Sequence, residues 1–535
     1  MSSRSRPLTD CLLLAGFCAF LFFFGLSSFG LVGPDEPRYA QVAREMLARH
    51  DWITPTLDGK PWLEKPVLYY WQAILAYKLF GVKDWAARLP SALDATLMVF
   101  SVYLFLRRFR PGFQLDGALI VASIAGVIGF ARAASMDMPL AATFTISLLA
   151  WYAWFESGNK LYLPACYFFL ALATLAKGPV AILLAALVIS IFTGLKGNYR
   201  LLSRFLWIPG ILLFGLLTLP WYVAVQLKNF EFFRIFILEQ NFARYGTNLY
   251  RHDQPFWFYI PVVLLALVPW TIFVVCATAH TIRKLWADKF NLLQSVAAFN
   301  VFLVIWLLVP IVFFSISRSK LPGYTLPALP AGGLLLAEYV RRHSIDDTHP
   351  PLILMVLHSV LAALLIAPAV LLPYIVLQHR FPWGRTTAIL FAFAIVLAAG
   401  MIFTLRSGAG LGMLRFVTLI PVVLAVAAVL KIGAPALDAM FSARPLTTEI
   451  ARIENKPLPL AILRVSRETQ YGLEFYRDQT IPRYELGEIP ATEHLLIAPE
   501  GLQMSIATGV GGRRVLYLGS FAPQGLDYYW VAPAK

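Results

Sequence analysis

Long apolar runs alternate with short polar segments along the chain up to about residue 432. The runs are roughly 17–25 residues long, which is the length that crosses a bilayer as a helix with its backbone polar groups paired internally. The pattern therefore predicts about thirteen transmembrane helices. They are expected at 9–30, 87–106, 114–131, 138–156, 161–176, 178–195, 205–227, 255–278, 293–315, 324–340, 351–377, 386–405 and 412–432.

Basic residues mark one side of this predicted bundle. They gather in the short loops after the even-numbered spans, where the positive-inside rule is most reliable. These residues are Arg107, Arg108, Arg110, Lys160, Lys196, Arg200, Arg204, Arg283, Lys284, Lys289, Arg341, Arg342 and Arg406. The N-terminus is also basic, and no small-residue cleavage site follows the first run, so we expect a retained span with a cytoplasmic N-terminus. An odd number of spans then places the C-terminal tail outside.

The first outer loop, 31–86, has a pattern of its own. Its first part is amphipathic, because five apolar residues share one helical face. These are Tyr39, Val42, Ala43, Met46 and Leu47. A second helix is expected over 65–80, and the segment 51–62 between them is rich in turn residues and aromatics. Helices too short and too polar to span usually lie in the membrane interface.

The tail differs from the rest, because short β-branched and aromatic runs are separated by turn residues. Strands are expected at 460–465, 495–497, 515–518 and 528–531. A helix is expected over 468–478, and no catalytic motif occurs in the tail. The pattern predicts two units: a transmembrane domain at 1–432 and a small α/β domain at 433–535.

Composition agrees with this α-helical, polytopic membrane class. The chain is 59% hydrophobic and only 14% charged, whereas soluble proteins are nearer a quarter charged. The net charge of +15 lies in short loops, which fits topology and anionic headgroups better than nucleic acid. All four cysteines lie inside apolar runs, so we expect no disulfide framework. The sequence contains no Gly-rich phosphate loop, so we expect no nucleotide cofactor.

Charged residues recur at the outer ends of the spans. If the topology is right, they face one side of the membrane, where carboxylates can act as a general base and cations can hold a phosphate. They are Asp35, Glu36, Glu64, Lys65, Asp137, Lys177, His252, Asp253, Arg318 and Lys320. Asp35 and Glu36 directly follow the first span, where charge is costly unless it is paired or functional. We interpret Asp35 as the chemical centre.

Each of these residues also has a structural interpretation. Glu36 suits helix capping better than Asp35, and Asp137 before Met-Pro can equally be a cap. Lysines at span ends commonly snorkel to headgroups, and a lone histidine is more often a hydrogen-bonded surface residue than a ligand. A transporter would place charge at midplane depth, where Asp94 is the main candidate. The residues alone therefore leave enzyme and transporter open.

A longer motif narrows the choice. The motif runs Gly33-Pro34-Asp35-Glu36-Pro37-Arg38-Tyr39-Ala40, then Arg44-Glu45-Met46-Leu47, Asp51-Trp52, Leu57-Asp58-Gly59, Glu64-Lys65-Pro66 and Tyr70-Trp71. It resembles the first periplasmic loop of the bacterial lipid A aminoarabinose transferases, of the protein O-mannosyltransferase-like, GT-C superfamily. The resemblance is close over about 9–180 and looser through Tyr324.

The resemblance implies a GT-C membrane fold with a periplasmic C-terminal domain, in the bacterial inner membrane. It implies an inverting glycosyltransferase that moves a sugar, 4-amino-4-deoxy-L-arabinose or a similar one, from polyprenyl (undecaprenyl) phosphate to lipid A. A protein or glycan acceptor is the alternative. The implied catalytic residues are Asp35, Asp137 and Lys177. The implied donor-phosphate ligands are Lys65, Arg318, Lys320 and Tyr324. Glu64 and His252 match positions where this family can hold zinc.

Overall fold

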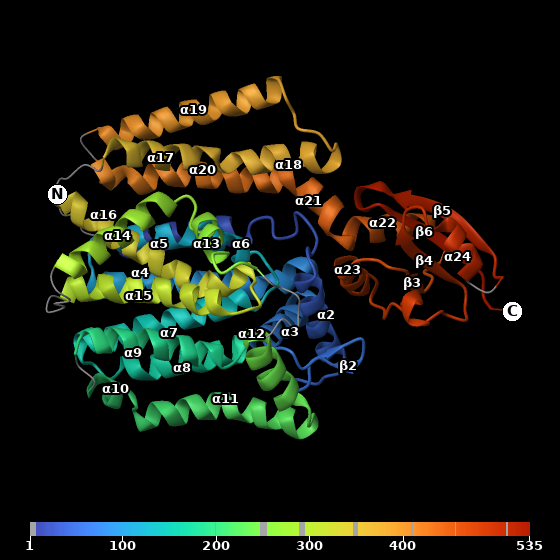
Figure 1. The fold of residues 1–535 in the computed structure, drawn as a ribbon, viewed down its shortest axis with the longest axis horizontal. Helices are drawn as coiled ribbons and strands as arrows, with labels where there is room; N and C mark the ends of the chain where they lie inside the picture. Colours follow the sequence, from blue (N-terminus) through green and yellow to red (C-terminus); the bar gives the residue numbers. More distant parts are fainter. Residues whose placement is uncertain are drawn as a thin grey trace.

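In a computed structural model the chain forms a helical bundle with a small α/β domain at one end (Figure 1). The first outer loop lies between the two parts and contacts both. The structure describes residues 7–197, 200–246, 254–287, 295–345, 351–407, 410–454, 456–509 and 512–534.

Seven helices in these ranges are long and apolar enough to cross a bilayer. They are Asp84–Phe109 (α4), Asp137–Ser157 (α7), Ile208–Lys228 (α11), Ala298–Ile316 (in α15, Ser295–Ile316), Leu352–Leu377 (α17 to α18), Arg385–Arg406 (α19) and Leu411–Phe441 (α20 to α21). Three shorter apolar helices are Pro7–Phe23 (α1 with η1), Tyr162–Lys177 (α8) and Val180–Leu195 (α9). Each predicted span coincides with a helix or helix pair, and the total of thirteen stays a prediction.

Two predicted spans are broken. The span expected at 114–131 consists of α5 (Gln114–Ala122) and α6 (Ala125–Ala131), bent by 64°. The span expected at 255–278 consists of α13 (Tyr259–Ala266) and α14 (Thr271–Ala287), bent by 115°. The breaks pair with each other, because the Ala125 N–H donates to the Val268 carbonyl at 2.9 Å and the Trp270 indole donates to the Ser123 hydroxyl at 3.0 Å. Backbone groups freed by the bends are thereby satisfied within the protein.

The first span is shorter than predicted. Its helix ends at Phe23 rather than residue 30. Two arginines bond the carbonyls of the irregular segment that follows. Arg132 donates to the carbonyls of Leu21, Phe24 and Gly25, and Arg88 donates to those of Leu26, Phe29 and Gly30. Apolar composition predicted a helix here, but side-chain donors from distant elements replace helical hydrogen bonds.

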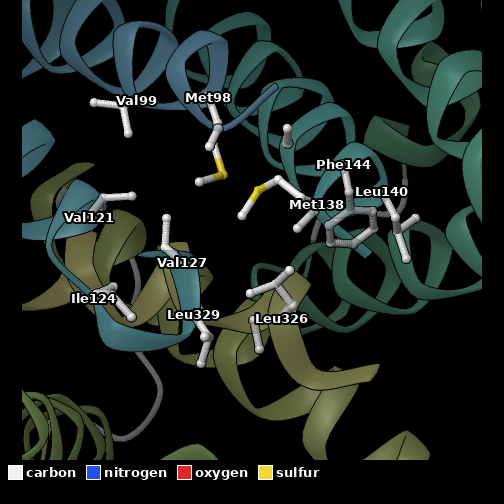
Figure 2. Packing of buried hydrophobic residues seen from close by; sticks show 14 of the residues in the cluster. Met98, Val99, Val121, Ile124, Val127, Met138, Leu140, Phe144, Leu326 and Leu329 are labelled. Atoms are coloured by element: carbon white, nitrogen blue, oxygen red, sulfur yellow. The ribbon is translucent and has the colours of Figure 1, made fainter. Parts of the chain in front are cut away.

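The centre of the bundle is α7, whose apolar stretch is 94% buried. Figure 2 shows side chains of α4, α7, the α5–α6 break, η3 (Pro322–Ala328) and α16 (Leu329–Ile345) meeting there. They include Met98, Val99, Val121, Ile124, Val127, Met138, Leu140, Phe144, Leu326 and Leu329. Asp137, one of the charged residues singled out in the sequence, is the first residue of α7.

The first outer loop contains the two expected helices, α2 (Asp35–Ala48) and α3 (Leu68–Phe80). The second begins three residues later than predicted, because Pro66 disfavours helical backbone at Lys65. Between the helices a hairpin pairs β1 (Thr56–Leu57) with β2 (Lys60–Pro61). Its turn residues Asp58 and Gly59 have φ of 53° and 71°, the geometry for which Asp-Gly is favoured.

The remaining helices connect these elements or make up the spans Leu352–Leu377 and Leu411–Phe441. They are α10 (Arg200–Phe205), η2 (Phe233–Ala243), α12 (Arg244–Gly246), α17 (Leu352–Ala363), η4 (Leu364–Ile366), α18 (Ala367–Leu377), η5 (Gly410–Met413), α20 (Leu414–Ala428), η6 (Val429–Gly433) and α21 (Ala434–Phe441).

The C-terminal domain has the expected α/β character. Its helices are α22 (Ala443–Ile453), α23 (Arg467–Arg477), η7 (Tyr484–Leu486), α24 (Gln503–Gly509) and η8 (Ala522–Gln524). Its sheet has the order β3-β4-β6-β5, from Leu460–Ile462, His494–Pro499, Leu526–Val531 and Val515–Phe521. β3 is parallel to β4, and the other pairs are antiparallel. The preceding helix runs through residue 433 to Phe441, and the separate domain core includes Ala443. The predicted boundary at 432/433 stays a prediction.

Candidate active site

Glu36 is almost fully buried at the start of α2. Its carboxylate accepts from Arg88 Nη2 at 2.6 Å and Nε at 2.9 Å, and from the backbone N–H groups of Val32 at 2.8 Å and Ala134 at 2.7 Å. The residue is thus in a structural role, as the sequence suggested. The cap interpretation was wrong in its detail, since the α2 N-terminus has no side-chain cap. Because Ala134 lies just before α7, Glu36 ties α2 to that helix.

Asp35 has a more open environment. Its side chain is 50% exposed, and Oδ1 forms an ion pair with Arg38 one turn along α2. The Arg38 guanidinium in turn lies over the rings of Tyr39 at 5.0 Å and Trp62 at 5.2 Å. These contacts fix the arginine, so Asp35 is oriented while remaining accessible.

Asp137 and Lys177 form a second ion pair. Asp137 is the first residue of α7 and makes no cap hydrogen bond to its own helix, so its cap interpretation is not supported. Lys177 is the last residue of α8, and its ammonium lies 4.8 Å from the centre of the Tyr324 ring. Gly323 packs against the Asp137 carboxylate, since a Cβ there would lie 2.7 Å from Asp137 Cγ. A side chain at this position would therefore have to displace the Asp137 carboxylate.

Beside this pair lies a cavity of about 470 Å³, here called the cationic cavity. Its lining contains three cations and one carboxylate: Lys65, Lys177, Arg244 and Glu64. Gln240, Asn241, Tyr245, Ser317, Ser319 and Tyr324 add polar groups, and Leu140, Pro179, Val180, Leu183, Phe236, Phe242, Phe313 and Phe314 form its apolar wall. Burial, together with the charges of Arg244 and Lys177, lowers the pKa of Lys65 to about 7, although Glu64 opposes the shift. An anion in this cavity would relieve the repulsion.

A second cavity of about 580 Å³, here called the acidic cavity, lies on the other side of the pair. Its charged lining is Asp35, Glu36, Asp137 and Arg132. Much of the remaining wall is apolar and comes from α6, the α13–α14 break, η4, α20 and η6. Lys177 lines the cationic cavity and Asp137 lines the acidic one, so the two partners of one ion pair lie in the walls of two different spaces.

Other predicted site residues lie elsewhere. Arg318 is exposed and does not line the cationic cavity, and the buried Lys320 ammonium donates to the Ser317 carbonyl. Both were expected at the donor phosphate, and that role stays a prediction without geometric support. His252 lies outside the described residues. Within those residues no group of three or more His, Cys, Asp or Glu side chains can hold a metal ion, so the zinc prediction rests on Glu64 alone.

Three arginines in these surroundings were missed from the sequence. Arg244 follows η2 and donates to Gln240 Oε1 at 2.9 Å and to Ser319 at 3.3 Å. Arg38 lies in the motif that carries the resemblance, yet no role was assigned to it. Arg132 ends α6. No local pattern distinguishes such residues from ordinary interfacial cations, because their positions depend on helix ends far apart in sequence.

Asp94, the candidate for a transport path, accepts two hydrogen bonds of 3.1 Å from the Gln72 amide. Because Gln72 belongs to the interfacial helix α3, the carboxylate faces the outer loop. This contact does not resemble a midplane transport site.

Comparison with known proteins gives related sequences and a shared fold. Residues 64–223 match the family described as dolichyl-phosphate-mannose-protein mannosyltransferase. The chain is 34% identical over 341 residues to the undecaprenyl phosphate-alpha-4-amino-4-deoxy-L-arabinose arabinosyl transferase of Pseudomonas aeruginosa (strain UCBPP-PA14), which covers 62% of this chain and 60% of that protein. Identity to the enzyme of the same description from Serratia proteamaculans (strain 568) is 30% over 336 residues, 61% of this chain and 58% of the relative. The chain thus aligns with about three-fifths of these relatives' length.

The fold agrees over nearly the whole chain. The crystal structure of ArnT from Cupriavidus metallidurans bound to undecaprenyl phosphate superposes with a TM-score of 0.76 at 22% identity, covering 97% of both chains. The resemblance inferred from the sequence is confirmed, as is a multi-pass helical membrane fold like that of ArnT, with a small C-terminal sheet domain.

Proposed function

We propose that this chain, which resembles aminoarabinose transferases and has the ArnT fold, is an integral membrane glycosyltransferase. It moves a sugar from undecaprenyl phosphate to an extracytoplasmic acceptor, with 4-amino-4-deoxy-L-arabinose as the sugar and lipid A as the acceptor. The observation that carries the proposal is the Asp137–Lys177 pair, with its cation in one cavity and its carboxylate in the other.

The cationic cavity takes the donor. Lys65, Lys177 and Arg244 are placed to bind the carrier phosphate, and their charge stabilises it as negative charge develops on the leaving group. The apolar part of the lining suits the polyprenyl chain of the carrier. Tyr324, beside Lys177, helps to hold that ammonium against the leaving phosphate.

The acidic cavity takes the acceptor. The acceptor oxygen attacks the anomeric carbon and forms the new C–O bond, while the bond from that carbon to the carrier phosphate oxygen breaks and its electron pair stays on the phosphate. Attack opposite the leaving group inverts the anomeric centre. If the acceptor is a hydroxyl, Asp35 accepts its proton; if it is an ionised phosphate, Asp35 only orients it. Asp137 holds Lys177 in the donor cavity and closes the acceptor side.

Orientation and metal binding belong to the same proposal. We place the protein in the bacterial inner membrane, with a cytoplasmic N-terminus and the C-terminal domain in the periplasm, because basic residues gather in the even-numbered loops. Zinc binding by Glu64 and His252 is retained as a proposal. One carboxylate does not define a zinc site, so no step is assigned to the metal.

The test compares purified wild-type protein with Asp35→Asn, using undecaprenyl phosphate–aminoarabinose and lipid A, with mass spectrometry of the product. Transfer to an acceptor hydroxyl should fall by about 100- to 10,000-fold, because a positioned carboxylate that accepts the proton contributes that much, whereas transfer to an ionised phosphate should fall less. Donor binding should not change, since Asp35 does not line the cationic cavity. Wild-type rates in Asp35→Asn would refute the mechanism.

A protein acceptor is the second candidate, because the matched family model describes protein mannosyltransferases. The same assay separates the two candidates when membrane proteins and lipid A are offered together with radiolabelled donor. Label in lipid A supports the first proposal, and label only in protein supports the second.

A further inference from the structure

The charges of the acidic cavity are almost all paired. Asp35 pairs with Arg38, Glu36 with Arg88 and Asp137 with Lys177. The exception is Arg132, which lines the same cavity and forms no ion pair within the described part of the chain. Of the four charged side chains that line this cavity, it is therefore the one whose charge is not compensated by a side chain.

The donors of Arg132 are only partly used. Nη1 donates to the Leu21 carbonyl at 3.0 Å, and Nη2 donates to the Phe24 and Gly25 carbonyls at 2.9 Å each. A guanidinium has five N–H donors in a planar fork that suits phosphate and carboxylate. The three contacts fix the side chain and leave two donors for a ligand.

Backbone support alone does not account for a cation at this position. Burial, together with the charge of Arg88, lowers the pKa of Arg132 to about 10. A neutral amide side chain, with two N–H donors, could donate to two of these three carbonyls without this desolvation cost, whereas a partly buried cation at a membrane edge is expensive unless it is paired or functional. The missing partner is therefore an anion.

The rest of the wall indicates what carries that anion. The wall includes Leu365, Val422, Ala425, Val426, Val429 and Leu430 on η4, α20 and η6. An apolar wall beside one uncompensated arginine is complementary to a lipid with an anionic head group. A neutral glycan or an unmodified serine would satisfy neither feature.

We propose that Arg132 binds a phosphate of the acceptor lipid and thereby selects phosphate-bearing acceptors. The proposal rests on the proposed function, since it assigns the acidic cavity to the acceptor. Arg132 also offsets the repulsion between an incoming phosphate and the cavity carboxylates. Lipid acyl chains lie along η4, α20 and η6, while the phosphate faces the α6 end.

The test is a binding measurement without donor, so it does not depend on turnover. Native mass spectrometry of the full-length protein in detergent measures binding of lipid A and of the same lipid A after removal of its phosphates. Wild type should prefer the phosphorylated lipid by about 10- to 100-fold, the worth of a charge-assisted hydrogen bond. Arg132→Gln should lose this preference and bind the dephosphorylated lipid as wild type does. Comparing both lipids in wild type and in Arg132→Gln separates a loss of phosphate binding from general structural damage.

Two further variants complete the design. Arg385→Gln removes an equal charge from an exposed residue at the start of α19 and should keep the full preference. Arg132→Lys keeps the charge and should keep most of the preference, which tests the proposal even if Arg132→Gln does not fold. Equal binding of both lipids by wild type, or an undiminished preference in Arg132→Gln, would overturn the proposal. If wild type instead shows the preference but transfers no sugar, the proposed function fails and the anion site stands.

Discussion

The two cavities differ less in size, about 470 and 580 Å³, than in charge. One is lined by three cations and one carboxylate, and the other by three carboxylates and one arginine. A leaving phosphate gains from fixed positive charge, whereas an attacking hydroxyl needs a carboxylate. Because one partner of the Asp137–Lys177 pair lines each cavity, both requirements can be met within one protein.

Helix ends help to maintain this arrangement of charges. Asp137 lies in the first turn of α7 and Lys177 in the last turn of α8. The macrodipole stabilises an anion at a helix N-terminus and a cation at a C-terminus, each by about 0.3–1 kcal/mol. Each charge is therefore favoured by its own helix as well as by its partner.

Reversing the pair tests whether the order of the charges matters or only their attraction. We expect Asp137→Lys and Lys177→Asp each to reduce kcat/KM by about 100- to 1,000-fold, because each removes charge stabilisation from the reaction. The double variant restores opposite charges but puts each in the wrong cavity, so activity should stay low. Steady-state transfer assays measure this.

The ion pair between Asp116 and Arg415, 2.8 Å apart, provides the matched control. Neither residue lines either cavity, so reversing both should leave kcat/KM close to wild type. Recovery of activity in the Asp137→Lys/Lys177→Asp double variant would show that pairing alone suffices. It would contradict the claim that each cavity needs its own sign of charge.

A smaller effect is expected at the neighbouring carboxylates of α2. Glu36→Gln should lower the free energy of unfolding by about 3–5 kcal/mol, because it leaves the buried Arg88 guanidinium without a counter-charge. Asp35→Asn should change it by less than about 1 kcal/mol, because that ion pair is half exposed. Equilibrium unfolding in mixed micelles measures both. Equal losses would mean that the two carboxylates share one role.

These neighbours also show what the sequence can reveal. The apolar runs identified the spans, and the turn-rich segment 51–62 marked the hairpin, because both depend on local pattern. The expectation that Glu36 has the more structural role of the two agrees with its burial, while Asp35 is the more exposed carboxylate and its catalytic role stays a prediction. The partner of Glu36 was not predictable, since Arg88 lies 52 residues away and resembles any charged residue at the start of a span.

The failures have a common physical cause. The first helix ends early because Arg88 and Arg132 satisfy its downstream carbonyls, and the two bent spans depend on each other's backbone groups. Arg244 joins the cationic cavity where Arg318 was expected, because the chain folds back through η2 and α12. Long-range hydrogen bonds decide each case, and a single sequence carries no local trace of them.

A pH effect on donor binding is expected in the cationic cavity. In the free protein the pKa of Lys65 is about 7, so Lys65 is charged below this pH and becomes neutral above it. The donor phosphodiester stays ionised throughout, so the pH dependence comes from the protein. Donor affinity should be greatest below pH 7 and should fall by up to about tenfold per pH unit above it. Donor titrations from pH 6 to about 9 measure the change.

Lys65→Arg separates this effect from a general effect of pH, because arginine stays charged over the whole range. The variant should bind donor with an affinity that is nearly flat with pH, even if its larger head group lowers that affinity. Acceptor binding in the acidic cavity should not follow the same profile, since Lys65 does not line it. A wild-type profile that is flat, or one that Lys65→Arg reproduces, would show that another group governs the donor cavity. A cation other than Lys65 would then have to determine donor binding in the cationic cavity.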